Sequence, residues 1–190
     1  MPRRISPLAR RRRLMTVLAA ILVILVGAWS WFAVTKIYFP RLDPVPDDVD
    51  VLVQVGGIPW KDYQTARDTA QRLGIRDLVL SDPSSGTEVH NRYCGPLEGV
   101  RVHCFAPDPS TTRGEARAFA ELAEQNNWHS AYVLATGREH VERARLYFSR
   151  CWDGELAVNR PTSGRPLRTH LSQSWYQTAG WLKAAQDSSC

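Results

Sequence analysis

The chain has 190 residues, which is enough for one domain of ordinary size plus an appendage and too few for two full enzyme domains. Its formal net charge is +5, but six arginines lie within the first 13 residues: Arg3, Arg4, Arg10, Arg11, Arg12 and Arg13. Without these six, 18 basic residues face 19 acidic ones, so the body of the protein is not basic and we expect no nucleic-acid partner. A hydrophobic share of 44% with 23% charged residues is typical of a folded chain and excludes a fully disordered one.

An uncharged apolar run follows these arginines. Residues 14–35 hold 22 positions without a charge, and about 20 apolar residues are enough to cross a bilayer. We therefore predict a transmembrane helix over residues 14–37, with Trp29, Trp31 and Phe32 near its end, where aromatic rings settle at the headgroup level. A cleaved signal peptide and a buried soluble helix are the alternatives, but the run is longer than the roughly 7–15 apolar residues of a signal peptide.

The same arginines predict the orientation, because positively charged flanks stay in the cytoplasm. Residues 1–13 would form a cytoplasmic tail, and the chain beyond the anchor would lie outside a plasma membrane that it crosses once. The four cysteines all follow the anchor, and an even number in an oxidising compartment indicates two disulfides with three pairings open. We favour Cys94–Cys104, clipping a loop to the next strand, and Cys151–Cys190, tying the end of a helix to the chain terminus. No cysteine or histidine spacing is typical of a zinc site, so we expect neither a metal nor a cofactor.

Beyond the anchor, residues 38–48 carry three prolines and are expected to form a stiff stalk, and residues 49–190 to form one domain. Short apolar runs bounded by turn residues predict buried parallel strands. The expected strands span residues 49–57, 77–81, 100–106, 130–136 and 154–159.

Amphipathic segments between these strands predict helices, whose apolar positions recur every three or four residues. The first carries Tyr63, Ala66, Ala70 and Leu73, and ends near Gly74. The second opens at Thr112 with Glu115 three residues later, as in a capping box, and buries Ala116, Phe119, Ala120 and Ala123. The third buries Val141, Ala144, Phe148 and Cys151. The last spans about 167–185 with Leu171, Trp175 and Leu182 on its buried side, and residues 82–99 are expected to be a long loop. Alternating strands and helices predict an α/β fold, a Rossmann-like open parallel sheet with helices on both faces.

Ligands of such sheets bind beyond the carboxyl ends of the strands, where helix N-termini and glycines favour anions. The turns at this edge, with the start of the helix after residue 140, supply residues that could bind a phosphate or pyrophosphate: Gly56, Gly57, Ser81, Thr112, Arg113, Thr136, Arg138 and Arg143. His140, Glu115 and Asp82 are the candidate catalytic acids or bases. Structural roles are the alternative for several of them: a tight turn for the glycines, an N-cap for Thr112, a capping-box partner for Glu115 and a turn for Asp82.

Four segments resemble, in order, the pattern of the YdcF-like family, the SanA/ElyC type of bacterial envelope protein. They read VLVQVGG, LVLSDP, CFAPDPSTTRGEA and VLATGREHVERARLYFSRC, within residues 49–158. The single anchor and final cysteine look like the actinobacterial single-anchor branch. The chain departs from the pattern at Tyr63, where an arginine is frequent, and at Glu115, where an asparagine is usual.

The resemblance implies a Rossmann-like fold and a role in cell-envelope glycan or peptidoglycan metabolism that involves polyprenyl-phosphate carriers. We therefore expect a membrane-anchored extracytoplasmic protein that binds a polyprenyl-phosphate-linked or other phosphate-bearing envelope precursor. If it also processes this precursor, phosphoester hydrolysis or glycan transfer is the expected reaction class. The alternative is a non-catalytic interaction or regulatory module of the envelope.

Overall fold

The computed structural model describes residues 7–56, 60–82, 87–160, 167–186 and 189–190. Its strands are β1 (Val51–Gln54), β2 (Asp77–Ser81), β3 (Arg101–Phe105), β4 (Ser130–Leu134) and β5 (Glu155–Asn159). Its helical segments are α1 (Pro7–Ala33), η1 (Val34–Tyr38), α2 (Trp60–Leu73), α3 (Thr87–Tyr93), α4 (Thr112–Asn126), η2 (Arg138–His140), α5 (Val141–Cys151) and α6 (Leu167–Gln186).

The five strands form one parallel sheet in the order β3-β2-β1-β4-β5. The order reverses between β1 and β4, which is the point where open α/β sheets leave a crevice at the carboxyl ends of their strands. The predicted α/β class with a Rossmann-like parallel sheet is therefore confirmed, and each predicted strand corresponds to an observed one.

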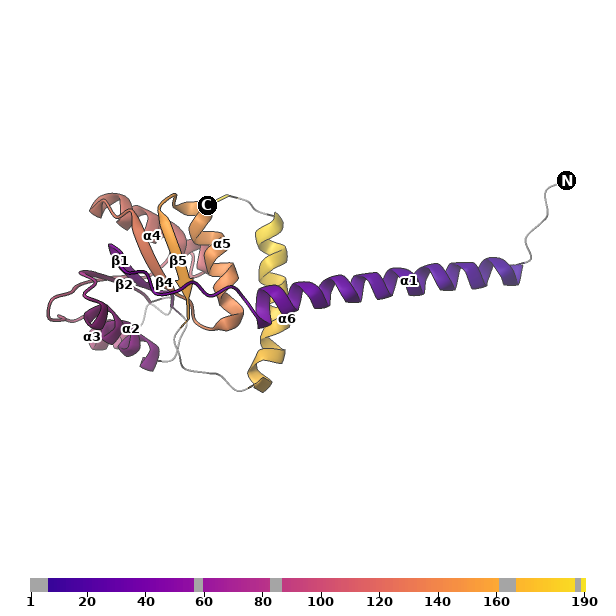
Figure 1. Ribbon diagram of the computed structural model, residues 1–190, viewed down its shortest axis with the longest axis horizontal. Helices are drawn as coiled ribbons and strands as arrows, with labels where there is room; N and C mark the ends of the chain where they lie inside the picture. The colour runs from indigo at the N-terminus through magenta and orange to yellow at the C-terminus, as the bar shows by residue number, and fades with distance from the viewer. Residues whose placement is uncertain (1–6, 57–59, 83–86, 161–166, 187–188) are drawn as a thin grey trace.

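Helices cover both faces of this sheet (Figure 1). Side chains alternate along a strand, so Leu52 of β1 packs toward α2 while Val51 and Val53 pack toward α4 and α5. On the α2 side, Ala66 and Ala70 are fully buried as the helical spacing predicted. On the other side, the rings of Phe119 and Phe148 bring α4 and α5 together over the sheet.

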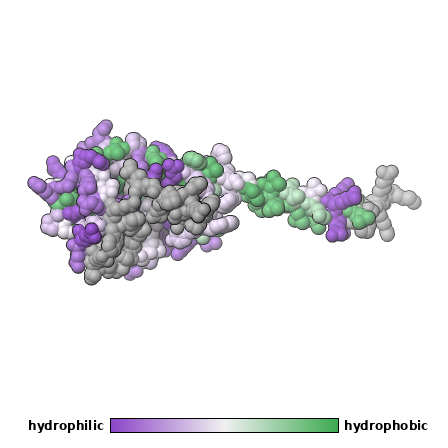
Figure 2. Space-filling model, turned by 90° about the horizontal axis from the view of Figure 1, so that it is seen from below, coloured by the Kyte–Doolittle hydropathy of each residue, from purple (hydrophilic) through white to green (hydrophobic). Residues whose placement is uncertain are grey.

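The N-terminal helix stands out from this domain (Figure 1). Residues Leu8–Tyr38 form a span of 31 residues that is apolar and long enough to cross a membrane, and its side chains are almost all exposed. The space-filling view shows the hydrophobic surface of this helix following a hydrophilic patch near its start (Figure 2). Arg10 to Arg13 already belong to α1.

The segment after the span, which the sequence predicts to be a stiff stalk, contacts the sheet domain through Asp43. Asp43 donates its N–H to the Val158 carbonyl (3.1 Å) and its carboxylate accepts the Val158 N–H (2.9 Å). The same carboxylate pairs with Arg145. Because β5 is an edge strand, its outer backbone groups are open to this pairing. The segment that follows the apolar helix is thus bound to the edge of the sheet.

Two elements differ from the sequence predictions. The expected loop over residues 82–99 contains the seven-residue helix α3. In α6, Trp175 and Leu182 were expected to be buried, but they are 72% and 63% exposed, and the helix buries Ser174, Gln177 and Ala184 instead. The predicted face was therefore wrong; the apolar pattern identifies an amphipathic helix but not which side meets the core.

Both favoured disulfides are confirmed. Cys94–Cys104 joins the residue after α3 to β3, and Cys151–Cys190 joins the end of α5 to the C-terminus. These bonds indicate an oxidising compartment.

Candidate functional site

The turn that opens α4 and the turn that follows β4 converge on His140. The Thr112 hydroxyl lies 2.9 Å from Nε2 of His140, and the Thr136 hydroxyl lies 2.9 Å from Nδ1. The imidazole is only 4% exposed. Thr136 therefore orients the His140 ring, and the other ring nitrogen lies against the Thr112 hydroxyl at the start of α4. A side-chain base that activates a hydroxyl group has the same arrangement.

The start of α4 differs from the predicted capping box. Thr111, not Thr112, is the N-cap, and its side chain accepts a hydrogen bond from the Gly114 N–H (3.2 Å). Since Thr111 takes the capping role, the Thr112 hydroxyl is available to His140. Glu115 does not reach back to the cap either, because its carboxylate turns toward the sheet.

Glu115 joins the ends of the first two strands. Its Oε1 accepts hydrogen bonds from the Gly56 N–H and from the Ser81 hydroxyl, both at 2.7 Å. Burial raises the pKa of Glu115, against the opposing effects of the Ser81 and Gly56 hydrogen bonds and of the positive charge of Arg143. The group is thus held in a site that favours its protonated form.

Tyr63 closes the other side of this cluster, because its hydroxyl donates to the Ser81 carbonyl (2.7 Å). Burial raises the pKa of Tyr63, and the nearby Asp82 and Glu115 carboxyls add to the effect. Tyr63, Ser81 and Glu115 are all buried, so this cluster lies behind the surface of the site.

A pocket of about 390 Å³ opens between the start of α4, α5 and α6. It is lined by Pro109, Ser110, Thr111, Thr112, Arg113, Arg143, Tyr147, Tyr176, Ala179, Gly180 and Lys183. Three cations and five hydroxyl groups are among these residues, and no described lining residue carries a carboxylate. The first turn of α4 adds the partial positive charge of a helix N-terminus, so the pocket suits an anion.

Arg143 is the most enclosed cation of this pocket. Its guanidinium lies over the ring of Tyr176, 5.4 Å from the ring centre, and against Gly180, where an added Cβ would overlap one of its nitrogens. Its Nε is buried and has no hydrogen-bond partner among the residues that the structure describes. A planar guanidinium group whose donors are not all used can bind an oxyanion through two parallel hydrogen bonds.

The predicted anion-binding residues divide into three groups. Thr112, Arg113 and Arg143 line the pocket, while Gly56, Ser81 and Thr136 bind the buried side chains behind it. Arg138 faces the other way, because it donates to the Tyr38 carbonyl (3.2 Å) and lies over the Phe39 ring. Gly57 is outside the described residues.

The candidate catalytic groups are enclosed as well. Glu115 and His140 are each 4% exposed, and Asp82 is 7% exposed at the end of β2, where its N–H donates to the Phe105 carbonyl. None of the three is among the lining residues of the pocket, although His140 reaches it through Thr112.

Sequence reasoning missed two contributions to this region. Tyr176 and Lys183 come from α6, which the sequence placed with its aromatic side in the core. Gln54 ends β1 fully buried; its amide donates to the Val55 and Leu134 carbonyls, and its Oε1 has no partner within the described part of the chain. Gln54 could have been noticed in the sequence because it is a polar residue inside an apolar strand. No local sequence feature indicates that Lys183 lines the pocket.

His90, Cys94 and Cys104 bring three potential metal-binding atoms within 4.8 Å of one another. Both cysteines are joined in a disulfide, so neither sulfur is a thiolate that could bind a metal.

Comparison of the chain with family models, with curated proteins and with solved structures finds no match.

Proposed function

We propose that this chain is a single-pass membrane protein whose α/β domain lies outside the cytoplasm and binds a phosphate-bearing, lipid-linked precursor of the cell envelope. The observation that carries this proposal is the cationic pocket formed by α4, α5 and α6 beside the apolar span. The resemblance to YdcF-like proteins supports the same class of ligand. Confinement to the membrane would keep the pocket close to a substrate that is itself held there.

In this proposal the phosphate oxygens bind Arg143 and Arg113, and Lys183 closes the pocket from α6. Hydrogen bonds to charged groups contribute roughly 1.5–3 kcal/mol each to binding. With a protonated Nε2 on His140, the Thr112 oxygen accepts from the imidazole and its hydroxyl proton is donated to a phosphate oxygen. The pocket is large enough for a phosphate together with part of the group attached to it.

The geometry supports binding more directly than turnover. Glu115, Asp82 and His140 are buried and outside the pocket lining, so a ligand there would meet arginines and hydroxyls first. Phosphoester hydrolysis or glycan transfer, with His140 as general acid or base through Thr112, is the second candidate function, and the short Thr112–His140 contact favours it.

Binding is tested with the full chain in detergent, titrated calorimetrically with inorganic phosphate, pyrophosphate and a polyprenyl phosphate. Replacing Arg143 by alanine removes one charged ligand group, so Arg143→Ala is expected to weaken binding by roughly ten- to a hundredfold, at about 1.4 kcal/mol per factor of ten. Arg138→Ala is the matched control, because Arg138 lies on the same segment but faces the linker. Equal affinities of the wild type and Arg143→Ala would contradict the proposal.

Turnover is tested separately, by release of phosphate or glycan from lipid-linked precursors. If the site is catalytic, His140→Ala loses this release while Arg138→Ala keeps it. Binding that depends on Arg143, without any release by the wild type, would identify the non-catalytic envelope module.

A further inference from the structure

Among the residues of α6 whose side chains the structure describes, three large ones, Trp175, Tyr176 and Leu182, point away from the domain core. Trp175 and Leu182 lie seven residues apart on one helical face and are mostly exposed, and Tyr176 beside them is 62% exposed. The buried positions between residues 174 and 186 of the same helix are Ser174, Gln177 and Ala184. A surface helix of a water-soluble domain normally has the opposite arrangement, with its apolar stripe on the core.

Two tryptophans of α6, the exposed Trp175 and the partly buried Trp181, meet the end of the apolar span. The Trp175 ring stacks on Trp29 with the ring centres 5.5 Å apart, and Trp181 meets Phe32 edge-on at 5.7 Å. Figure 1 shows α6 lying across α1 and not alongside it. If α1 crosses the bilayer, α6 therefore runs along its surface.

The depth of these contacts matches an interfacial position. About 20 residues cross the hydrocarbon core, so a span that enters at Leu14 leaves it near Ala33. Trp29 lies four residues earlier, about 6 Å below that level at 1.5 Å per residue. Interfacial helices bury their apolar face about 5–10 Å into the boundary between headgroups and acyl chains, and tryptophan and tyrosine are enriched at that depth.

The domain is also held in this position. Lys36 pairs with Glu142 (3.1 Å), the Arg41 N–H donates to the same carboxylate (2.9 Å), and the Tyr38 and Ser174 hydroxyls lie 2.6 Å apart. With Asp43 bound to β5, these contacts fix α6 relative to the span.

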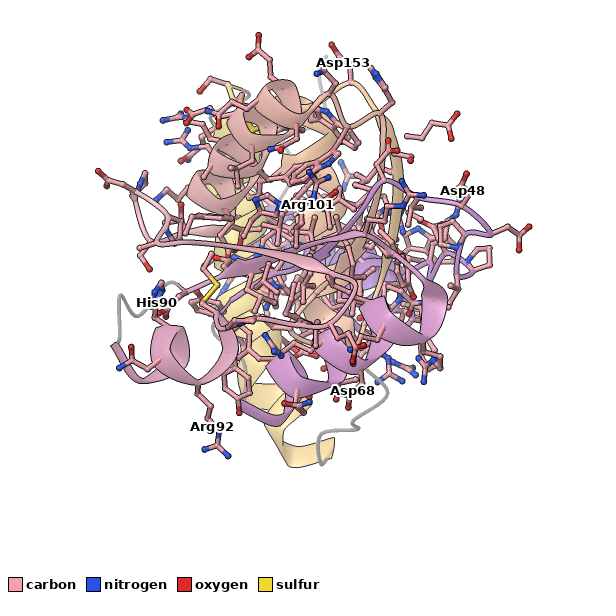
Figure 3. All side chains as sticks on the ribbon, turned by 90° about the vertical axis from the view of Figure 1, so that its left-hand side faces the viewer. Asp48, Asp68, His90, Arg92, Arg101 and Asp153 are labelled. Atoms are coloured by element: carbon pink, nitrogen blue, oxygen red, sulfur yellow. A yellow bond between two sulfur atoms is a disulfide. The ribbon has the colours of Figure 1, made fainter. Side chains whose placement is uncertain are left out.

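The charge distribution agrees with this placement. None of the 20 residues of α6 is acidic, and Lys183 is exposed on it; interfacial helices gain binding energy from such basic residues when the lipids are anionic. The view from the side opposite the anchor shows charged side chains around the periphery of the domain, among them Asp48, Asp68, Arg92 and Asp153 (Figure 3).

We propose that α6 is an interfacial helix that lies in the leaflet from which α1 emerges, with Trp175 and Leu182 inserted among the lipid headgroups. Tyr176, Gly180 and Lys183 of the same helix line the pocket, so its mouth opens at headgroup level. A lipid-borne group could then reach Arg143 without leaving the bilayer. The membrane contact of α6 depends on α1 crossing the bilayer and not on which anion the pocket binds.

Photo-crosslinking tests this contact in the full chain, reconstituted in vesicles of phosphatidylethanolamine and phosphatidylglycerol. A benzophenone amino acid replaces Leu182 in α6, Ile21 in the span or Asp68 on the far side; all three positions are exposed, and formation of both disulfides verifies folding. We expect lipid adducts by mass spectrometry at positions 182 and 21 and none at position 68.

Three outcomes would overturn the proposal. Adducts between two copies of the chain at position 182, in place of lipid, would assign the face to self-association. Lipid adducts at position 21 alone would support the membrane span and show that α6 does not contact lipid. Lipid at neither position would refute the membrane span itself, whereas anion binding by the pocket is measured separately in detergent.

Discussion

At the scale of single residues, the site depends on which side chains take the structural roles. Thr111 caps α4, so Thr112 meets His140, and Glu115 is free of the cap and binds Gly56 and Ser81. Glu115 is buried, and burial raises its pKa against the opposing effects of the Ser81 and Gly56 hydrogen bonds and of Arg143. Its protonation should therefore be visible in the stability of the domain.

Replacing Glu115 by glutamine keeps an acceptor oxygen for both hydrogen bonds and removes the charge. The pKa of Glu115 is raised above 4.5 in the folded state, so the folded chain binds more protons than the unfolded one between pH 4.5 and that raised value. The contribution of this group to stability is thus present at low pH and is lost as the pH rises through the raised pKa. Glu115→Gln should remove this loss and melt at an equal or higher temperature than the wild type at pH 8.

The measurement is the melting temperature of both proteins from pH 4 to pH 8. Glu121→Gln is the control, because Glu121 is an exposed residue of the same helix. The raised pKa of Glu115 would be contradicted if the melting temperature of the wild type did not fall relative to that of Glu115→Gln as the pH rises.

At the scale of elements, the pocket wall depends on how closely the turn before α4 packs on its first turn. Gly114 makes this possible, since an added Cβ would overlap the backbone carbonyl of Pro109, which cannot rotate away. The glycine is required for close approach of two backbone segments, and Pro109 to Arg113 can then form one side of the pocket.

Gly114→Ala should lower the free energy of unfolding by about 1–3 kcal/mol, the usual cost of overpacking, although alanine is the better helix former. It should also weaken phosphate binding, because the turn must shift. Denaturant unfolding and the phosphate titration measure the two effects. Gly95→Ala is the control, because a Cβ there would meet open space; an equal effect of both substitutions would refute the close-approach argument.

At the scale of the whole molecule, the apolar N-terminal helix, the linker and α6 are joined to the sheet domain by specific contacts. Asp43 and Glu142 bind the linker and the end of the span, and the Trp29–Trp175 stack adds α6. Although burial opposes it, the hydrogen bond from Val158 and the Arg145 guanidinium hold the pKa of Asp43 below its usual value, so this clamp stays charged at neutral pH. These contacts link the pocket-forming helices to the end of the apolar helix.

The arginines at the start of α1 predict a cytoplasmic N-terminus and an external domain. A reporter enzyme that is active only outside the cytoplasm should work when fused after Cys190 and fail when fused before Leu14. Activity assays of the two fusions in intact cells measure this, with a cytoplasmic reporter as the reciprocal control. The reverse pattern would place the domain in the cytoplasm and contradict the proposed function.

The sequence by itself determined the features that depend on local composition. The strands were predictable because buried parallel strands are continuous apolar runs. The long apolar helix was predictable because 22 consecutive uncharged residues are enough to cross a bilayer as a helix. The two disulfides followed from an even count and from the position of each cysteine beside a strand or a helix end.

The tertiary structure alone decided which residues share the site. Arg138 and Arg143 are five residues apart and equally cationic, yet one faces Phe39 and the other the pocket, because the turn between them sets their directions. The exposed face of α6 could not be read from its periodicity either. A helical pattern shows which side chains are apolar, but whether they meet a protein core or the end of an apolar span depends on where the folded chain places the helix.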